Sequence, residues 1–215
     1  TIDGVSGGAS EMIDRLKVVE KRWLEEPERD AMKLVMVRMA LLESFRTAGR
    51  LAEGVEYSGR MIREAERTSD LLLQTFAVKA QNLSFLVRDD PEGALAALDR
   101  PLWTSPDSGF HIHHLYELRA RVEVDLYRGE VRGLAERHGR RLRQAKLSMM
   151  SLLRAFKLEL GSLEARMLLA EPGRFPSWTA SRIRRIAGRV VDPGNPEHLV
   201  RASMLRAGAA ALEGD

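Results

Sequence analysis

The sequence predicts an all-α protein, organised as a tetratricopeptide-like α-solenoid of about five antiparallel helical hairpins. From Ser10 onward, apolar residues recur at the three- and four-residue spacing of amphipathic helices. Alternating runs rich in Val, Ile and Thr, which are typical of strands, do not occur in the sequence. Turn-forming residues return about every 40 residues, and the 215-residue chain accommodates about five such periods. Each hairpin of a solenoid buries its apolar face against its neighbours, so we expect the array to be stable only as a whole.

The repeat is clearest at the breaks between the predicted helices. Gly49, Asp89 and Gly129 follow one another at intervals of 40 residues, and a fourth break lies at 170–173. The same interval separates Ala40, Ala80 and Ala120. This period is longer than the roughly 34 residues of a tetratricopeptide repeat and lies in the range of HEAT and armadillo repeats, and the standard tetratricopeptide signature is not matched.

Each predicted period holds a shorter and a longer helix. Ser10 can cap the first helix with its hydroxyl, and Pro27 suits the first turn of the second. The shorter helices are predicted at 11–25, 50–67, 91–101, 130–145 and 177–191, and the longer ones at 28–47, 70–88, 110–128, 147–170 and 197–213. We expect residues 1–9 to form a flexible leader and residues 10–215 a single repeat domain. Because the sequence starts at Thr1 without an initiator Met, we expect it to be a fragment of a longer protein.

Composition excludes several classes of protein. The chain has no cysteine, which excludes disulfides, thiolate zinc sites, iron–sulfur clusters and thiol catalysis, and which fits a reducing, cytoplasmic location. No apolar run approaches the roughly 20 residues that span a membrane. Charge is uneven: residues 1–100 hold 15 Lys and Arg against 18 Asp and Glu, whereas residues 101–215 hold 19 against 13.

The residues that end the helices resemble a known family. The stretch 109–116 opens with Gly-Phe-His, and 125–130 reads Asp-Leu-Tyr-Arg-Gly-Glu. These stretches, together with 166–170 and 206–215, resemble the tetratricopeptide-like C-terminal region of large bacterial serine/threonine protein kinases and ATPase-containing signalling regulators. The resemblance covers about residues 30–215. It implies a non-catalytic sensor or scaffold attached to a kinase or a nucleotide-driven switch, and no HRD or DFG element of a kinase occurs in the sequence.

Three histidines stand together at the start of the helix predicted over 110–128. His111 and His114 are three residues apart and share a helix face, a spacing that can place two imidazoles on one metal ion. A third ligand would have to come from elsewhere in the chain. The alternative is that one histidine packs under the preceding loop while the others are solvated or hydrogen-bonded.

Two basic runs lie on successive shorter helices. Residues 131–146 carry six Lys and Arg against one Glu, and residues 182–189 carry four Arg. Neighbouring helices of a solenoid would merge these charges into one stripe, which could bind an acidic protein, bind nucleic acid, or form a solvated outer face. Neither run holds an aromatic residue for stacking on bases, which disfavours single-stranded nucleic acid.

We therefore expect a protein- or peptide-binding module without catalysis or cofactor. By analogy with tetratricopeptide arrays, polar residues of the shorter helices should line the concave groove. The residues predicted to bind are Glu56, Arg60, Arg63, Arg137, Arg141 and Arg184. We also expect dimerisation through exposed terminal hairpins. The alternatives are a nucleic-acid-binding helical repeat that uses the basic stripe, and the helical part of an enzyme with a metal at His111 and His114.

Overall fold

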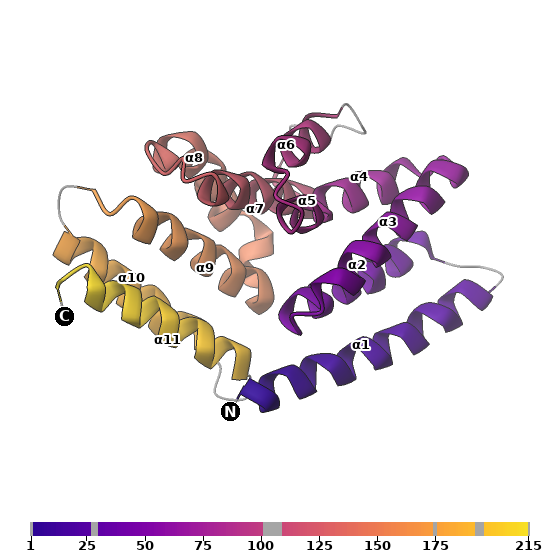
Figure 1. The fold of residues 1–215 in the computed structure, drawn as a ribbon, viewed down its shortest axis with the longest axis horizontal. Helices are drawn as coiled ribbons and strands as arrows, with labels where there is room; N and C mark the ends of the chain where they lie inside the picture. The colour runs from indigo at the N-terminus through magenta and orange to yellow at the C-terminus, as the bar shows by residue number, and fades with distance from the viewer. Residues whose placement is uncertain (1, 27–29, 101–108, 174–175, 192–195, 215) are drawn as a thin grey trace. The chain divides into compact units, whose positions relative to one another are not determined.

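The computed structural model describes residues 2–26, 30–100, 109–173, 176–191 and 196–214. Over these residues the regular secondary structure is helical, without a strand, which confirms the all-α prediction (Figure 1). The chain divides into two compact units, Thr1–Thr104 and Ser105–Asp215. The solenoid arrangement, the number of hairpins and the single domain over 10–215 stay predictions.

The first unit is a succession of helices that pack on their neighbours along the chain. They are α1 (Ile2–Glu25), α2 (Ala31–Thr47), α3 (Leu51–Thr68), α4 (Leu71–Ala80), α5 (Asn82–Leu86) and α6 (Pro91–Asp99). Helix α2 lies against α1 and α3, α3 lies against α4, and α5 lies against α6. Phe45, Met61 and Phe76 are fully buried in this unit, where α2, α3 and α4 pack against one another.

A buried arginine ties the first three helices together. The side chain of Arg38 on α2 is only 3% exposed. Its guanidinium donates to Glu20 of α1 at 2.8 Å and to Glu64 of α3 at 2.7 Å. The hydroxyl of Tyr57 also donates to Glu20, at 2.8 Å. Because a buried charge is costly unless it is paired, this network fixes how α1, α2 and α3 fit together.

The second unit is arranged around a central helix. Its elements are α7 (Ile112–Tyr127), α8 (Leu134–Leu147), the 3₁₀ turn η1 (Met149–Leu152), α9 (Arg154–Ala170), α10 (Pro176–Val190) and α11 (Pro196–Ala211). Helix α9 packs against α7, α8, α10 and α11. Leu160 and Leu163 face the cluster shared with α7 and α8, whereas Leu158 and Ala165 face the cluster shared with α10 and α11. Burial on both sides holds α9 in place between its neighbours.

The 40-residue interval of the sequence corresponds to a repeated helix end. Gly49, Asp89 and Gly129 all adopt left-handed backbone conformations, with φ of 69°, 57° and 70°. In each case the next residue donates its N–H to the carbonyl four residues before that left-handed position. These bonds run from Arg50 to Phe45, from Asp90 to Phe85 and from Glu130 to Asp125, at 2.9, 3.0 and 2.9 Å. This is the Schellman motif, which satisfies the last carbonyls of a helix and turns the chain.

Several helix boundaries differ from the prediction. Helix α1 begins at Ile2, so Ser10 lies inside it rather than capping it, and residues 2–9 are helical rather than a leader. Glycine lowers helix propensity by only about 1 kcal/mol per residue, too little to end a helix by itself. The helix predicted over 70–88 is interrupted at Gln81. Helix α8 begins four residues later than predicted, because Gly133 before it is left-handed, with φ of 75°.

Candidate functional site

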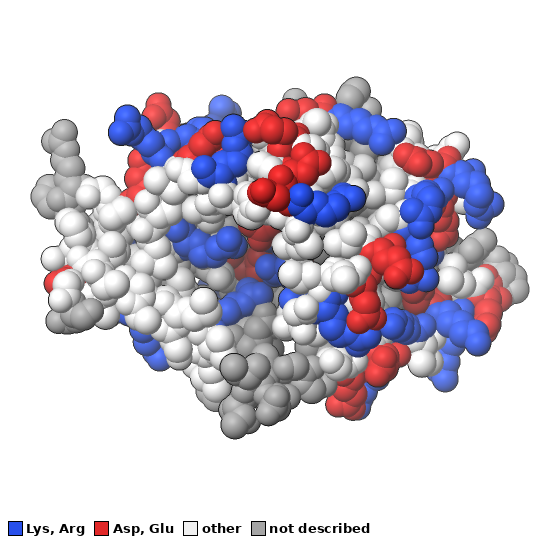
Figure 2. All heavy atoms as spheres, in the orientation of Figure 1, with Lys and Arg blue, Asp and Glu red and all other residues white. Residues whose placement is uncertain are grey.

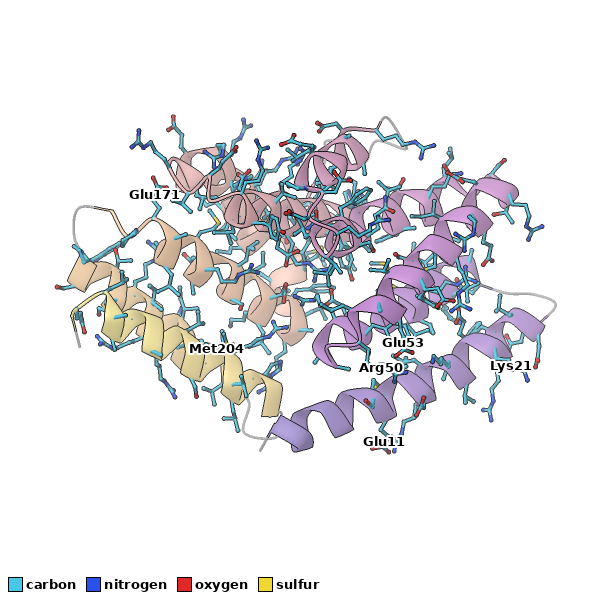
Figure 3. All side chains as sticks on the ribbon, in the orientation of Figure 1. Glu11, Lys21, Arg50, Glu53, Glu171 and Met204 are labelled. Carbon is cyan, nitrogen blue, oxygen red and sulfur yellow. The ribbon has the colours of Figure 1, made fainter. Side chains whose placement is uncertain are left out.

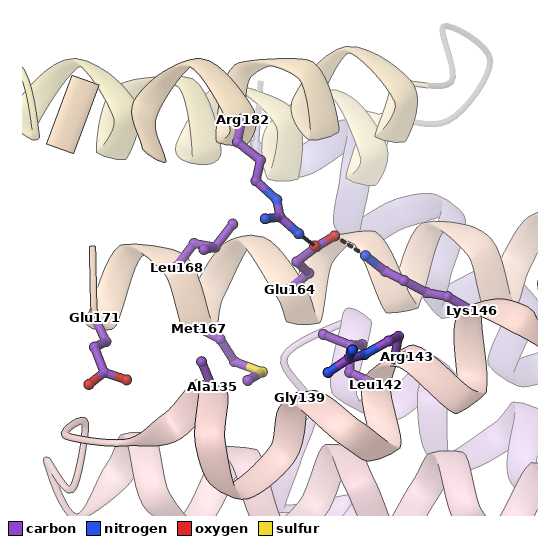
Figure 4. A pocket seen from close by; sticks show the side chains of 10 residues that line it. All are labelled: Ala135, Gly139, Leu142, Arg143, Lys146, Glu164, Met167, Leu168, Glu171 and Arg182. Atoms are coloured by element: carbon purple, nitrogen blue, oxygen red, sulfur yellow. Dashed lines mark hydrogen bonds and ion pairs between the residues drawn. The ribbon is translucent and has the colours of Figure 1, made fainter. Parts of the chain in front are cut away.

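An open groove of about 360 Å³ lies in the second unit, where α8, α9 and α10 meet. Helices α8 and α10 both pack on α9, which forms the floor of the groove with Met167 and Leu168 (Figure 4). The two walls come from shorter helices of successive predicted hairpins. Figure 4 shows Arg182 reaching down from α10 and Lys146 reaching across from α8 toward the same point on α9.

Helical periodicity explains which residues of α8 line the groove. Leu134, His138 and Leu142 recur every four residues and are buried. Gly139 follows His138 directly in the sequence, and Arg143 follows Leu142. Both therefore lie beside the buried face of α8, and both line the groove. A Cβ atom built on Gly139 would meet no atom within 4 Å, so this glycine leaves the groove open.

A buried carboxylate stands at one end of the groove. Glu164 of α9 accepts hydrogen bonds from Lys146 and from Arg182 (Figure 4). Its side chain is 9% exposed, whereas those of Lys146 and Arg182 are 37% and 41% exposed. Burial alone would raise the pKa of Glu164, but the hydrogen bonds and charges of the two cations outweigh it and lower the pKa below its ordinary value. Glu164 is therefore held ionised and joins α8, α9 and α10.

Two further charged residues, Arg143 and Glu171, line the groove. Arg143 is exposed and has no ion pair within the described part of the chain. Glu171, at the far end of α9, accepts a hydrogen bond from the backbone N–H of Gly133 at 2.7 Å through Oε1. Its Oε2 is buried and has no hydrogen-bond partner among the residues that the structure describes. Glu164 and Glu171 are seven residues apart, about 10 Å along the helix, so the groove has a cationic end and a separate carboxylate end.

None of the six residues predicted to bind lines this groove. Glu56, Arg60 and Arg63 lie exposed on α3 in the first unit, where the Arg60 guanidinium stands 5.4 Å from the ring centroid of Tyr57. Arg141 is exposed on α8 and does not line the groove, although the next residue, Leu142, does. The use of these four residues for binding stays a prediction.

The other two predicted residues have structural partners. Arg137 donates to Asp125 at 3.0 Å and to the carbonyls of Arg132 and Glu130, so it holds the turn between α7 and α8. Arg184 donates through both terminal nitrogens to Glu213 and thereby joins α10 to the residues after α11.

The histidine cluster forms the beginning of α7. The backbone N–H of His111 donates to Nδ1 of His114 at 3.0 Å, so this nitrogen is used within the helix cap. His113 is buried and its ring stands against that of His114, with 4.7 Å between centroids. The described residues contain no group of three or more His, Cys, Asp or Glu side chains that could hold a metal ion.

One feature of the sequence points to the groove, although it lies outside the residues predicted to bind. Glu164 is buried on α9 together with the apolar residues Leu163, Ala165 and Met167. A lone carboxylate on a buried face requires cationic partners. Lys146 and Arg182 were recognised only as members of the two basic runs, because sequence spacing does not show that both reach the same carboxylate.

Apolar side chains are also exposed on the last helix. Leu199, Val200 and Met204 of α11 are exposed, and Figure 3 shows the place of Met204 on this helix. In Figure 2 the face over α11 is mainly uncharged, whereas elsewhere blue and red side chains are interspersed. These are the side chains that the predicted dimer through terminal hairpins would use, and that dimer stays a prediction.

Comparison with family models, with curated proteins and with solved structures finds no match to this chain. Among the described helices, none is both long and apolar enough to cross a membrane.

Proposed function

We propose that this chain is a non-catalytic scaffold or sensor module that binds protein or peptide as part of a bacterial signalling regulator. In this proposal the helices form a tetratricopeptide-like α-solenoid, attached to a kinase or nucleotide-switch domain as the sequence resemblance implies. The module acts in the cytoplasm by presenting a rigid surface on which a partner segment docks.

The observation that carries the proposal is the groove between α8, α9 and α10. Its volume of about 360 Å³ is in the range of small ligand pockets, and it combines an apolar floor with charged walls. The charged groups at its cationic end serve to bind rather than to transfer protons. Glu164 is held ionised by Lys146 and Arg182, which is the opposite of the raised pKa that a general acid needs.

A pair of matched glycine variants tests the proposal. Peptides are first selected by display on the full chain, and their affinities are then measured by fluorescence anisotropy. Gly139→Leu places a side chain in the groove without a backbone clash. Gly188→Leu on α10 is the control, because a Cβ there also meets no atom within 4 Å and Gly188 does not line the groove. We expect Gly139→Leu to weaken binding at least about tenfold and Gly188→Leu to leave it unchanged. Equal binding by wild type and Gly139→Leu would overturn the proposal.

A basic surface on α8 supports a second candidate, binding of nucleic acid. Arg140, Arg141 and Arg143 are exposed and have no ion pair in the ranges that the structure describes. Cations of this kind neutralise phosphates, and binding then falls steeply with salt. An electrophoretic titration with single- and double-stranded DNA and RNA at two salt concentrations tests this candidate. Absence of a salt-sensitive complex would exclude it.

A further inference from the structure

We infer that the partner of the groove is an acidic peptide segment in which a carboxylate side chain and a large apolar side chain lie two residues apart. This inference rests on the proposed function, since it names the chemistry of the segment that docks in the same groove. The carboxylates engage the cationic end of the groove, and the apolar side chains cover the adjoining turn between α8 and α9.

The chain segment that forms the α8 side of the cationic end carries charge of one sign. Residues 137–158 contain seven Lys and Arg and no Asp or Glu. This stretch includes the last three turns of α8, the 3₁₀ turn and the start of α9. Arg140, Arg143 and Lys157 have no ion pair within the described residues. Such a surface attracts a negatively charged segment and repels a basic one.

The cations of the groove retain donors for a ligand. Glu164 is one carboxylate shared between Lys146 and Arg182, and both cations remain more than one-third exposed. Arg143 lines the groove on the α8 wall, as Lys146 does, and has no carboxylate partner among the described residues. An incoming carboxylate therefore meets Lys146 and Arg182, which Glu164 holds in place, and the exposed Arg143; an arginine can bind it through two parallel hydrogen bonds.

An exposed apolar turn continues from this cationic end. Leu147 follows Lys146 directly, and it lies one helical turn beyond Arg143 on the same face of α8. The residues Leu147, Met149 and Leu152 are 84%, 83% and 80% exposed. Three large apolar side chains exposed to this degree within six consecutive residues mark a candidate interaction surface.

The apolar turn is closed by hydrogen bonds from its own side chains. The Ser148 hydroxyl donates to the carbonyl of Ala145 at 2.7 Å, and the Ser151 hydroxyl donates to the carbonyl of Ser148 at 2.8 Å. Met150 points the other way and packs on the apolar cluster between α7, α8 and α9. Because the hydroxyls of the turn are already satisfied, a partner can cover it without leaving them unpaired.

The spacing of the two features sets the pattern of the ligand. Arg143 and Leu147 are separated by about 6 Å along the helix axis. Two residues of an extended chain span a similar distance. We therefore expect an acidic residue and a large apolar residue at positions i and i+2 of the bound segment, with side chains on the same side of its backbone.

The test uses three fluorescent peptides of equal length and the full chain. The first peptide has Asp or Glu and Leu or Phe in the expected spacing. The second replaces the acidic residues by Lys, and the third replaces the apolar residues by Ser. We expect the first peptide to bind, the other two to bind at least about tenfold more weakly, and the affinity of the first to fall with added salt.

Two pairs of variants locate the binding surface. Arg143→Glu should weaken binding of the acidic peptide at least about tenfold, whereas Arg206→Glu, at an exposed arginine of α11 without an ion pair in the described residues, should not. Leu147→Ser should weaken binding, whereas Leu71→Ser, at an exposed leucine of the first unit, should not. Circular dichroism of each variant checks that the helical content is unchanged.

The outcomes separate this inference from the proposed function. If display yields peptides whose binding is abolished by Gly139→Leu but the acidic peptide does not bind, the inference is wrong and the proposed function stands. If no peptide binds in a manner sensitive to Gly139→Leu, both are wrong. If phosphatidylserine-containing vesicles, nucleic acid or a second copy of the chain bind with the same dependence on Arg143 and Leu147, while the acidic peptide does not, the partner class inferred here is wrong.

Discussion

Replacing Glu164 by Gln is expected to change stability and binding in opposite directions. The substitution keeps the size of the side chain and removes the charge that Lys146 and Arg182 share. The fold then loses the ion pairs that join α8, α9 and α10. The groove becomes more positive because the negative charge of Glu164 is removed. Both Lys146 and Arg182 then become available to a ligand.

The magnitude follows from the burial of the three groups. A hydrogen bond to a charged group contributes about 1.5–3 kcal/mol, and Glu164 accepts two of them. Both cations are more than one-third exposed, so solvent screens part of this interaction, and Gln keeps one oxygen as an acceptor. We therefore expect the free energy of unfolding to fall by about 1–2 kcal/mol. Removing a like charge about 6 Å from a bound carboxylate should tighten binding of the acidic peptide about five- to tenfold.

Urea denaturation followed by circular dichroism measures the first effect, and fluorescence anisotropy with the acidic peptide measures the second. Glu136→Gln is the matched control, because Glu136 is an exposed glutamate of α8 that does not line the groove. The control should change neither quantity appreciably. If Glu164→Gln is as stable as the wild type, or if it binds the acidic peptide more weakly, the assigned role of Glu164 is incorrect.

Three further predictions concern the fold. Because the pKa of Glu164 is lowered in the folded state, its contribution to stability is complete above the ordinary value of 4.5 and is lost as the pH falls through the lower folded value. The difference in unfolding free energy between wild type and Glu164→Gln should therefore shrink from about pH 7 to about pH 3. A difference that stays constant over this range would contradict the lowered pKa. Arg38→Met leaves Glu20 and Glu64 without their shared buried cation. Urea denaturation should therefore show a fall of about 3–5 kcal/mol in the free energy of unfolding, whereas a fall below about 1 kcal/mol would show that the network is dispensable. Ser69 ends α3 with a left-handed φ of 53°, so Ser69→Gly should raise the unfolding free energy by about 0.5–1 kcal/mol, and a lower thermal midpoint would refute the strain at this position.

The helices were predictable because their signals are local. Each predicted helix overlaps at least one observed helix, since apolar spacing and turn residues act within a few positions of the chain. Asp70 and Asp90 illustrate this, because each carboxylate accepts a backbone N–H three residues further on and so begins a helix. The interruption at Gln81 was not predicted, because the apolar pattern continues across it without a Gly or Pro.

The groove was not predictable to the same degree because its parts come from three helices. Lys146, Glu164 and Arg182 are separated by 18 residues at each step, and their meeting depends on how α8 and α10 pack on α9. In the sequence, Lys146 and Arg182 stand out only as members of the two basic runs. The analogy with tetratricopeptide arrays favours Arg137 and Arg184, whose guanidinium groups pair with Asp125 and Glu213 in the fold. Sequence alone does not distinguish a cation that joins helices from one that faces a ligand.

The Schellman motifs at Gly49, Asp89 and Gly129 have a consequence for how such a chain can change its length. Each joint is closed by hydrogen bonds of its own backbone, and the donor and acceptor positions are the same in all three. Removal of the 40 residues 50–89, so that Gly49 is followed by Asp90, would therefore rejoin the chain at a turn of the same geometry. Duplication of the same segment would add a period without a new kind of turn. A change of length by this 40-residue segment would therefore keep the hydrogen-bonded geometry of the joints, whereas the helix faces that pack against one another would change.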